Sequence, residues 1–148
     1  MIVYTGGTFD LFHVGHVRLL KHCRDYAGIN GPVVVSVNTD EFVASYKDAP
    51  ICPLAERMEM VAACKWVDRV VVNHGGADSK PAIEGVAPNF VVVGDDWAGK
   101  DYCGQMGFTA EWLAERNIAL RFVPYTNHVS STIIKVRLSD RWLERQVR

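Results

Sequence analysis

Five short runs rich in β-branched residues, separated by longer helical patterns, constrain the fold of this chain most strongly. The runs are Ile2-Val3-Tyr4, PVVVSV at 32–37, RVVV at 69–72, FVVV at 90–93 and ALRFV at 119–123. Uninterrupted apolar runs of this length are typical of strands covered on both faces. The alternation predicts one α/β domain over residues 1–148, with a doubly wound sheet of five parallel strands and helices on both faces.

Helical periods fill the intervals between these runs. Two apolar stripes are Val14, Val17, Leu20 and Ala27, and Leu54, Met58, Val61, Ala62 and Trp66. Ser79, Thr109 and Ser130 stand where helix N-caps are expected, and Pro53 suits a first-turn position. A last helix is predicted to carry Ile134, Leu138 and Trp142.

Composition limits the kinds of partner. The net charge of −1 with mixed signs gives no broad basic face, so nucleic acid is not an expected partner. No apolar run reaches membrane-spanning length and no secretory leader is recognised, which predicts a cytoplasmic protein that does not engage a membrane. The four cysteines show no C-x-x-C spacing, so reduced, structurally incidental thiols are expected.

The run GGTFDLFHVGHVRLL at 6–20 joins the first strand to the first helix. Gly6 and Gly7 let the backbone approach a ligand closely, and His13 and His16 lie three apart on one helix face. Free N–H groups and the positive helix end suit a phosphate. Histidines at this spacing also occur as surface or core pairs, and zinc would need a third ligand.

The same run resembles the T-x-F-D…H-x-G-H signature of the nucleotidyltransferase superfamily, whose members attack the α-phosphate of a nucleoside triphosphate and release pyrophosphate. The resemblance extends from Val3 to about Leu138 and implies a Rossmann-like fold. It implies that His13, His16 and Thr8 are catalytic. The nucleotide-binding residues that it implies are Gly6, Gly7, Thr8, Phe9, His13, Gly15, His16, Asp95, Asp96, Thr126, Ser130, Ser131 and Thr132.

GDDWAGK at 94–100 follows the fourth predicted strand and resembles the glycerol-3-phosphate cytidylyltransferase branch. A plain strand-to-loop turn with solvated acids is the alternative. The functional interpretation places Mg²⁺ on Asp95 or Asp96, and Trp97 and Lys100 on the acceptor side.

Three further segments match family motifs. SSTII at 130–134 resembles a helix start that holds the β- and γ-phosphates, although ordinary capping would also explain it. PLAER at 53–57 resembles a segment with a substrate-binding arginine, so Arg57 is a candidate catalytic residue and a solvated surface residue is the alternative. Lys47 and Lys80 lie near family substrate lysines, and both could equally be solvated loop residues.

Two departures from the cytidylyltransferase pattern concern the substrate pockets. Tyr125 stands where that branch has an arginine on the triphosphate, and about ten added residues begin with Asp101–Gly107. Another cation, with Lys100 favoured over Arg57 and Lys47, is expected to replace the missing charge.

The resemblance implies a cytidylyltransferase that uses CTP and a small phosphorylated alcohol, sn-glycerol 3-phosphate being expected, with Mg²⁺ as cofactor. Two alternatives stay open: an adenylyltransferase acting on a sugar phosphate, of the ADP-heptose type, and a nucleotide sensor without turnover. VNTD, PLAERM and SSTII favour the first alternative, whereas the intact histidines disfavour the second. Members of this family are often homodimers, so a homodimer is allowed.

Overall fold

A five-stranded parallel sheet forms the centre of the molecule in a computed structural model, which describes residues 1–97 and 99–148 and, for Trp97, the backbone alone. The strands are β1 (Val3–Gly7), β2 (Val33–Asn38), β3 (Arg69–Asn73), β4 (Phe90–Gly94) and β5 (Ala119–Val123). Their order is β3-β2-β1-β4-β5, with every pairing parallel. The predicted doubly wound, Rossmann-like α/β sheet is confirmed.

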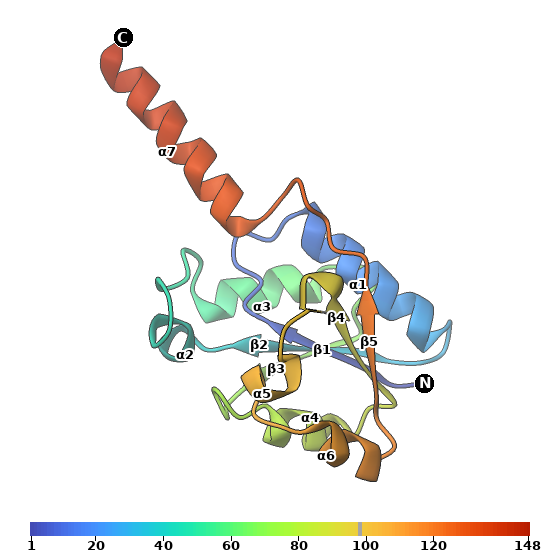
Figure 1. The fold of residues 1–148 in the computed structure, drawn as a ribbon. Coiled ribbons are helices and arrows are strands. Elements are labelled where there is room, and N and C mark those ends of the chain that lie inside the picture. Colours follow the sequence, from blue (N-terminus) through green and yellow to red (C-terminus); the bar gives the residue numbers. More distant parts are fainter. Residues whose placement is uncertain (98) are drawn as a thin grey trace.

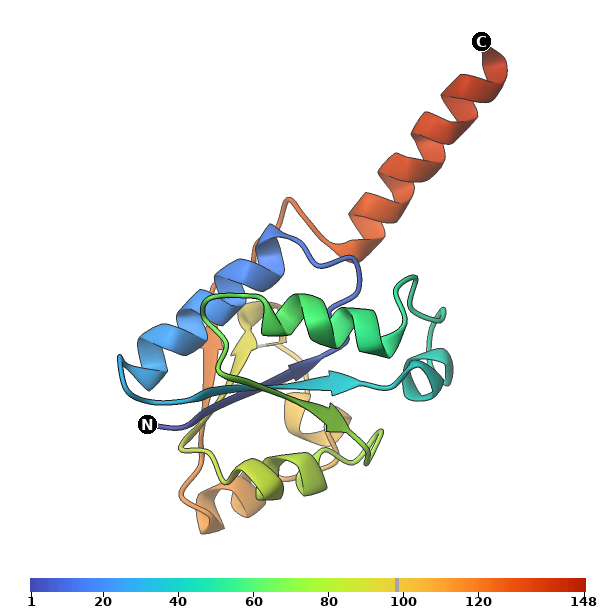
Figure 2. The ribbon, with the colours of Figure 1, turned by 180° about the vertical axis from the view of Figure 1, so that it is seen from behind.

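Helices cover both faces of the sheet (Figures 1 and 2). They are α1 (Val14–Ala27), α2 (Asp40–Ala44), α3 (Leu54–Ala62), α4 (Lys80–Val86), α5 (Tyr102–Gln105), α6 (Ala110–Glu115) and α7 (Ser131–Val147), with a 3-10 turn at Asp95–Trp97. One face packs against α1 and α3, and the opposite face packs against α4, α5 and α6. Among the described helices, none has the length and apolar character that a membrane crossing requires.

Alternation along the central strands divides the core into two layers. Val33, Val35 and Val37 pack with α1 and α3, whereas Val34 packs on the other side. The expected two-sided coverage is confirmed for β2, all of whose residues are buried. The expectation of burial on both faces is wrong for the outer strands β3 and β5. An edge strand pairs with a neighbour on one side only and is covered less completely by helices, and Phe122 in β5 is accordingly 40% exposed.

Most predicted helix boundaries agree with the structure. The hydroxyls of Thr109 and Ser130 accept the backbone N–H groups of Trp112 and Ile133, as N-caps do. Ser79 is an N-cap residue without a side-chain capping bond. The second predicted stripe is too long, since α3 ends at Ala62 and Trp66 lies beyond the helix. Pro53, predicted in the first turn, is the N-cap residue of α3.

The sheet opens between β1 and β4. Strand β1 pairs with β2 over its whole length, but with β4 only at Val3↔Phe90 and Tyr4↔Val91. Connections leave the sheet in opposite directions from these two central strands, which makes this gap the topological switch point. Ligands bind at the carboxyl ends of the strands beside such a point.

Candidate active site

A cavity of about 730 Å³ lies at this switch point. The β1–α1 connection from Gly6 to Asp10 forms one wall together with His16. The segment after β2 contributes Lys47, and the first turns of α7 contribute Thr132 and Lys135. The structure thus brings together, at one end of the sheet, residues that lie more than 120 positions apart in the sequence.

His13 and His16 cap the helix on which they stand. Nδ1 of His13 accepts the backbone N–H of Gly15 at 3.1 Å, and Nδ1 of His16 accepts the backbone N–H of His13 at 3.2 Å. A neutral imidazole that accepts at Nδ1 carries its proton on Nε2. Both rings therefore keep an Nε2–H group to donate, as stabilisation of a developing negative charge requires.

Ring stacking fixes the orientation of this pair. The centroids of the two imidazoles are 3.8 Å apart, and Phe12 stacks on His16 at 5.4 Å. Phe9 tilts against the same ring at 5.2 Å. Burial, followed by the charge of His13, lowers the pKa of His16 to about 3, and burial also lowers the pKa of His13. Both histidines are thus neutral donors near neutral pH.

This environment predicts that the free energy of unfolding falls as the pH decreases below about 6.5. His16 has a folded pKa near 3 and an ordinary value of 6.5, so the unfolded chain binds a proton first in this window. Stability therefore rises with pH between these two values. In urea titrations from about pH 4 to pH 7, His16→Gln should show a shallower pH dependence than the wild type. Equal slopes would contradict the neutral assignment.

The loop before the helix has an unusual backbone. Phe9 and Leu11 have φ values of 55° and 49°, in the left-handed region that side chains other than glycine rarely adopt. A Cβ on Gly15 would lie 2.8 Å from Cε1 of His13, so only glycine permits this ring position. Such strain persists where surrounding contacts fix the backbone, often at functional sites.

Arg57, predicted to be catalytic, has a different position. Its side chain is fully buried, and Nε donates to the carbonyl of Cys52 at 2.9 Å. Nη1 donates to the carbonyls of Thr8 and Asn38 at 2.7 and 2.9 Å, and Nη2 pairs with Asp40 at 2.6 Å. With its guanidinium enclosed by the protein, Arg57 is a positioning residue that holds the Thr8 loop, and it does not line the cavity.

The start of α7 faces the same loop. Ser130 Oγ serves as a helix cap, whereas Ser131 Oγ donates to the carbonyl of Asp10 at 2.7 Å. One turn later, Lys135 Nζ lies 3.7 Å from the Asp10 carboxylate. Thr132 and Lys135 line the cavity.

Sequence reasoning missed Asp10 and Lys135. The Asp10 carboxylate accepts the N–H groups of Ile51 and Cys52, and these bonds, with Lys135, hold its pKa below the ordinary value despite burial. The i, i+4 spacing from Ser131 to Lys135 was the available signal, because it places both on one helix face.

The two loop lysines differ in position. Lys47 lines the cavity, and burial followed by the charge of Lys135 lowers its pKa. Lys80 donates to the carbonyl of Gly107 at 2.6 Å and pairs with Asp78 at 3.0 Å. Lys80 is therefore committed to holding the turn at Gly107, and it does not line the cavity.

The turn after β4 separates the two acidic candidates. Asp95 Oδ1 accepts the backbone N–H of Tyr125 at 2.9 Å, which ties this turn to the β5–α7 connection. Asp96 lines the cavity, and burial raises its pKa while the nearby Lys100 lowers it. Lys100 itself is exposed and is not part of the cavity wall. The predicted role of the Trp97 side chain falls outside the described residues.

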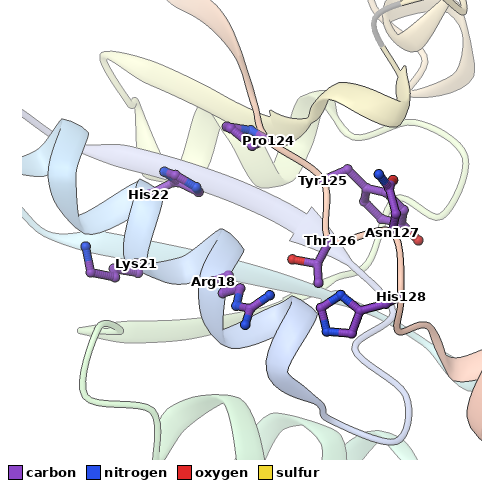
Figure 3. Close-up of a pocket in the computed structure, with 8 residues that line it drawn as sticks. All are labelled: Arg18, Lys21, His22, Pro124, Tyr125, Thr126, Asn127 and His128. Carbon is purple, nitrogen blue, oxygen red and sulfur yellow. The ribbon is translucent and has the colours of Figure 1, made fainter.

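A second pocket of about 400 Å³ lies between α1 and the β5–α7 connection (Figure 3). Arg18, Lys21 and His22 line it from the helix. Tyr125 and Thr126 line it from the connection, so the two predicted nucleotide-site positions face this pocket and not the larger cavity. Gly15 lies one turn before Arg18 on α1, and it lines neither this pocket nor the cavity at the switch point.

The described residues contain no group of three or more His, Cys, Asp or Glu side chains that could by itself hold a metal ion. Asp96 is the one predicted metal-binding carboxylate that lines the cavity, since Asp95 is bonded to Tyr125. Mg²⁺ is commonly held by one or two carboxylates together with substrate phosphates and waters. The residues present fit such a substrate-dependent site.

Comparison with known proteins agrees with this geometry. A family model described as cytidylyltransferase-like matches residues 4–137. An FAD synthase of Methanopyrus kandleri is 44% identical over 94 residues, which cover 64% of this chain and 62% of that protein. An ethanolamine-phosphate cytidylyltransferase of Dictyostelium discoideum is 33% identical over 150 residues, which cover 99% of this chain and 40% of that protein.

Two further proteins extend the comparison. The bifunctional protein HldE of Streptomyces coelicolor is 33% identical over 94% of this chain and 28% of its own length. The solved structure of a lipopolysaccharide core biosynthesis protein from Thermoplasma volcanium superposes with a TM-score of 0.68 and 25% identity, covering 85% of this chain and 98% of that one. The chain spans less than two thirds of each of the three sequence relatives.

Proposed function

Since this chain belongs to the cytidylyltransferase-like family, we propose that it transfers a cytidylyl group from CTP to a small phosphorylated alcohol. The product would be a CDP-alcohol with release of pyrophosphate, and sn-glycerol 3-phosphate is the first acceptor to test. The observation that carries the proposal is a pair of stacked, neutral histidines, each with its Nδ1 occupied, of which His16 lines the cavity at the switch point. The match to ethanolamine-phosphate cytidylyltransferase over 99% of the chain supports this acceptor class.

The proposed reaction is an in-line displacement at the α-phosphorus. An oxygen of the acceptor phosphate forms the new bond, while the bond from the α-phosphorus to the bridging oxygen breaks and pyrophosphate leaves. Nε2–H groups of His13 and His16 would donate to oxygens that gain charge in the transition state. The rigid Thr8 loop, held by Arg57, would position the α-phosphate. Mg²⁺, held by Asp96 and the phosphates, would supply further charge neutralisation.

Lys135 and Lys47 are the cations that the cavity offers to the triphosphate and the acceptor phosphate. Both line the cavity, and burial together with the positive charge of Lys135 lowers the pKa of Lys47. An anion bound between the two ammonium groups would stabilise the charge of both, which supports a polyphosphate at this position. The sequence predicted that Lys100 replaces the arginine that the cytidylyltransferase branch has at position 125. We assign this role to Lys135 instead, because it lines the cavity.

Lys135→Ala should therefore raise the KM for nucleotide by about tenfold or more, the effect expected for one charge-assisted contact. Lys135→Arg should retain most of the affinity. Lys100→Ala is the matched comparison, since it removes the same charge from outside the cavity wall. A larger effect at Lys100 than at Lys135, measured by steady-state kinetics, would reverse this assignment.

We assign the acceptor to the end of the cavity that the added segment lines. Helix α5 places Tyr102 and Gln105 in the wall, which Phe42 and Tyr46 from the segment after β2 also line. Phe42 and Tyr46 contact each other at 5.1 Å between ring centroids. Aromatic and polar groups at this end support an acceptor with both a hydroxyl-bearing part and an apolar part.

Adenylyl transfer is the second candidate. The 44% identity to an FAD synthase favours it, because FAD contains an adenylyl group, and the similarity to HldE favours it as well. Position 125 is a second argument, since it holds a tyrosine where the cytidylyltransferase branch has an arginine. The sugar-phosphate adenylyltransferase remains within this candidate. A nucleotide sensor without turnover would have no use for two transition-state donors.

A pyrophosphate-release assay with the four NTPs distinguishes these functions. The acceptors are glycerol 3-phosphate, phosphoethanolamine, a heptose phosphate and FMN, each assayed with and without Mg²⁺. We expect CTP with a phosphorylated alcohol to give the highest kcat/KM, and Asp96→Ala to lower it. A tenfold preference for ATP would assign the protein to adenylyl transfer, whereas nucleotide binding without pyrophosphate from any pair would indicate a sensor.

A further inference from the structure

A row of polar side chains crosses the carboxyl edge of the sheet over the neighbouring strands β1, β2 and β3 (Figure 2). Asn38 and Asn73 end β2 and β3, and they are register partners. Thr8 follows Gly7, the register partner of Val37, so Thr8 lies beside Asn38. Thr8 and Asn38 line the cavity, whereas Asn73 does not line it and is only 2% exposed. The row therefore runs from the cavity wall into the protein interior.

The amide of Asn73 is held in one orientation. Its Nδ2 donates to Asn38 Oδ1 at 3.0 Å and to the carbonyl of Gly76 at 2.9 Å. Turning the amide over would place its oxygen against these two oxygen acceptors. Asn73 Oδ1 is buried and has no hydrogen-bond partner among the described residues, which is uncommon for a polar atom in a protein interior. The two bonds made by Nδ2 thus fix the direction of the amide, although Oδ1 is left without a bond.

This fixed direction of Asn73 determines the direction of Asn38. Because Asn38 Oδ1 accepts from Asn73, Asn38 Nδ2 is turned toward Thr8 Oγ1, which lies 3.5 Å away. This separation is long for a hydrogen bond, and contacts of this kind commonly shorten when a substrate binds. An amide nitrogen carries two N–H groups, and no second bond of Asn38 Nδ2 is found in the described part of the chain. One N–H of Asn38 is therefore left for a ligand.

The direction of Asn38 in turn leaves the hydroxyl hydrogen of Thr8 free. A hydroxyl oxygen can accept from Asn38 with a lone pair while its O–H group donates elsewhere. Arg57 donates to the backbone carbonyls of Thr8 and Asn38, so the main chain at both residues is fixed and the side-chain amide decides the pattern of donors. The row thus offers two hydrogen-bond donors to the cavity, one from Thr8 and one from Asn38.

We propose that Asn38 binds an oxygen of the nucleotide α-phosphate together with Thr8, and that Asn73 is the positioning residue that holds both donors in the required direction. This role rests on the proposed function, because the α-phosphate is the group assigned to the Thr8 loop. Two donors aimed at one place suit an ionised phosphate, whose oxygens accept hydrogen bonds and donate none. The contact serves CTP and ATP equally, since both carry the same α-phosphate.

Replacing Asn38 with aspartate tests the substrate contact. The new carboxylate can still accept from Asn73, but its second oxygen faces Thr8, which removes the N–H donor and adds a negative charge beside the phosphate. We expect Asn38→Asp to lower kcat/KM by about a hundredfold or more with whichever nucleotide the enzyme uses. Asn30→Asp is the matched control and should leave kcat/KM unchanged, because it makes the same change at an exposed position before β2, at the opposite edge of the sheet.

A double-mutant cycle tests the positioning role of Asn73. In Asn73→Asp both side-chain oxygens accept, so the amide of Asn38 should turn over to donate to position 73, and the Thr8 hydroxyl then donates to Asn38 instead of the substrate. Thr8→Val exchanges the hydroxyl for a methyl group. It should lower kcat/KM about tenfold or more in the wild type, but less than about threefold in the Asn73→Asp background. Equal effects in both backgrounds would show that Asn73 has a structural role only.

Nuclear magnetic resonance of the wild-type chain provides a test that needs no substitution. In a sample with isotope-labelled asparagine, the side-chain amide signals of Asn38 should shift on saturation with CTP and Mg²⁺, whereas those of Asn30 should stay in place. Signals of Asn38 that do not shift would overturn its contact with the nucleotide.

Failure of this contact and failure of the proposed function give different results. Turnover by the wild type, together with unchanged kcat/KM in an Asn38→Asp variant that circular dichroism shows to be folded, would reject the contact and keep the function. A wild type that binds CTP with the expected shift of the Asn38 signals, but releases no pyrophosphate with any acceptor, would reject the function and keep the contact.

Discussion

Replacing His16 with alanine should lower kcat by about two to three orders of magnitude, while the KM for nucleotide changes little. The ring lines the cavity, is neutral, and has Nδ1 engaged with a backbone N–H, so Nε2–H is the group left to act on the substrate. A donor that acts mainly on charge formed in the transition state contributes to kcat and little to ground-state binding. His13→Ala should have an effect of the same order, because its ring stacks on His16 at 3.8 Å and carries the same type of donor.

Steady-state kinetics with CTP and glycerol 3-phosphate provide the measurement. His74→Ala is the control, since His74 is exposed and does not line the cavity. His16→Gln separates helix capping from catalysis, because its amide oxygen can accept the His13 N–H while the imidazole donor is lost. A folded His16→Ala variant with near wild-type turnover would remove His16 from the mechanism.

The fold was predictable because periodicity reports burial. The apolar runs of the central strands, with the alternating faces of β2, give a clear pattern of burial. The H-x-G-H spacing places two rings on one helix face through local geometry alone. The role of Arg57 could not be read in this way. Its partners are carbonyl oxygens, which every residue has, and they lie up to 49 positions away.

The direction of α7 was equally hidden from the sequence. Its stripe of Ile134, Leu138 and Trp142 predicts an apolar surface to cover but does not say whose surface covers it. Lys135 had only an indirect signal, its i, i+4 spacing from Ser131, and this spacing does not say that the shared helix face is turned toward the β1–α1 loop. Position relative to other elements, and not local pattern, decides both cases.

Arg57→Met should lower the free energy of unfolding by about 3–5 kcal/mol. Methionine has similar length and apolar character but no donor, so the carbonyls of Thr8, Asn38 and Cys52 lose their bonds to the guanidinium. Each buried acceptor left unsatisfied costs roughly 1–3 kcal/mol, and relaxation with water entry recovers part of the sum. Urea denaturation followed by circular dichroism measures the change. Arg69→Met is the matched control on the exposed side of β3, where a change within about 0.5 kcal/mol is expected.

The same variant distinguishes positioning from direct catalysis. If Arg57 holds the Thr8 loop, Arg57→Lys should recover part of the stability and of the turnover together, because both depend on how well the loop is fixed. If Arg57 acted on the substrate, Arg57→Lys would recover stability while turnover stayed lower by about a hundredfold or more. The buried guanidinium, bonded to three carbonyls and one carboxylate, leads us to expect the first result.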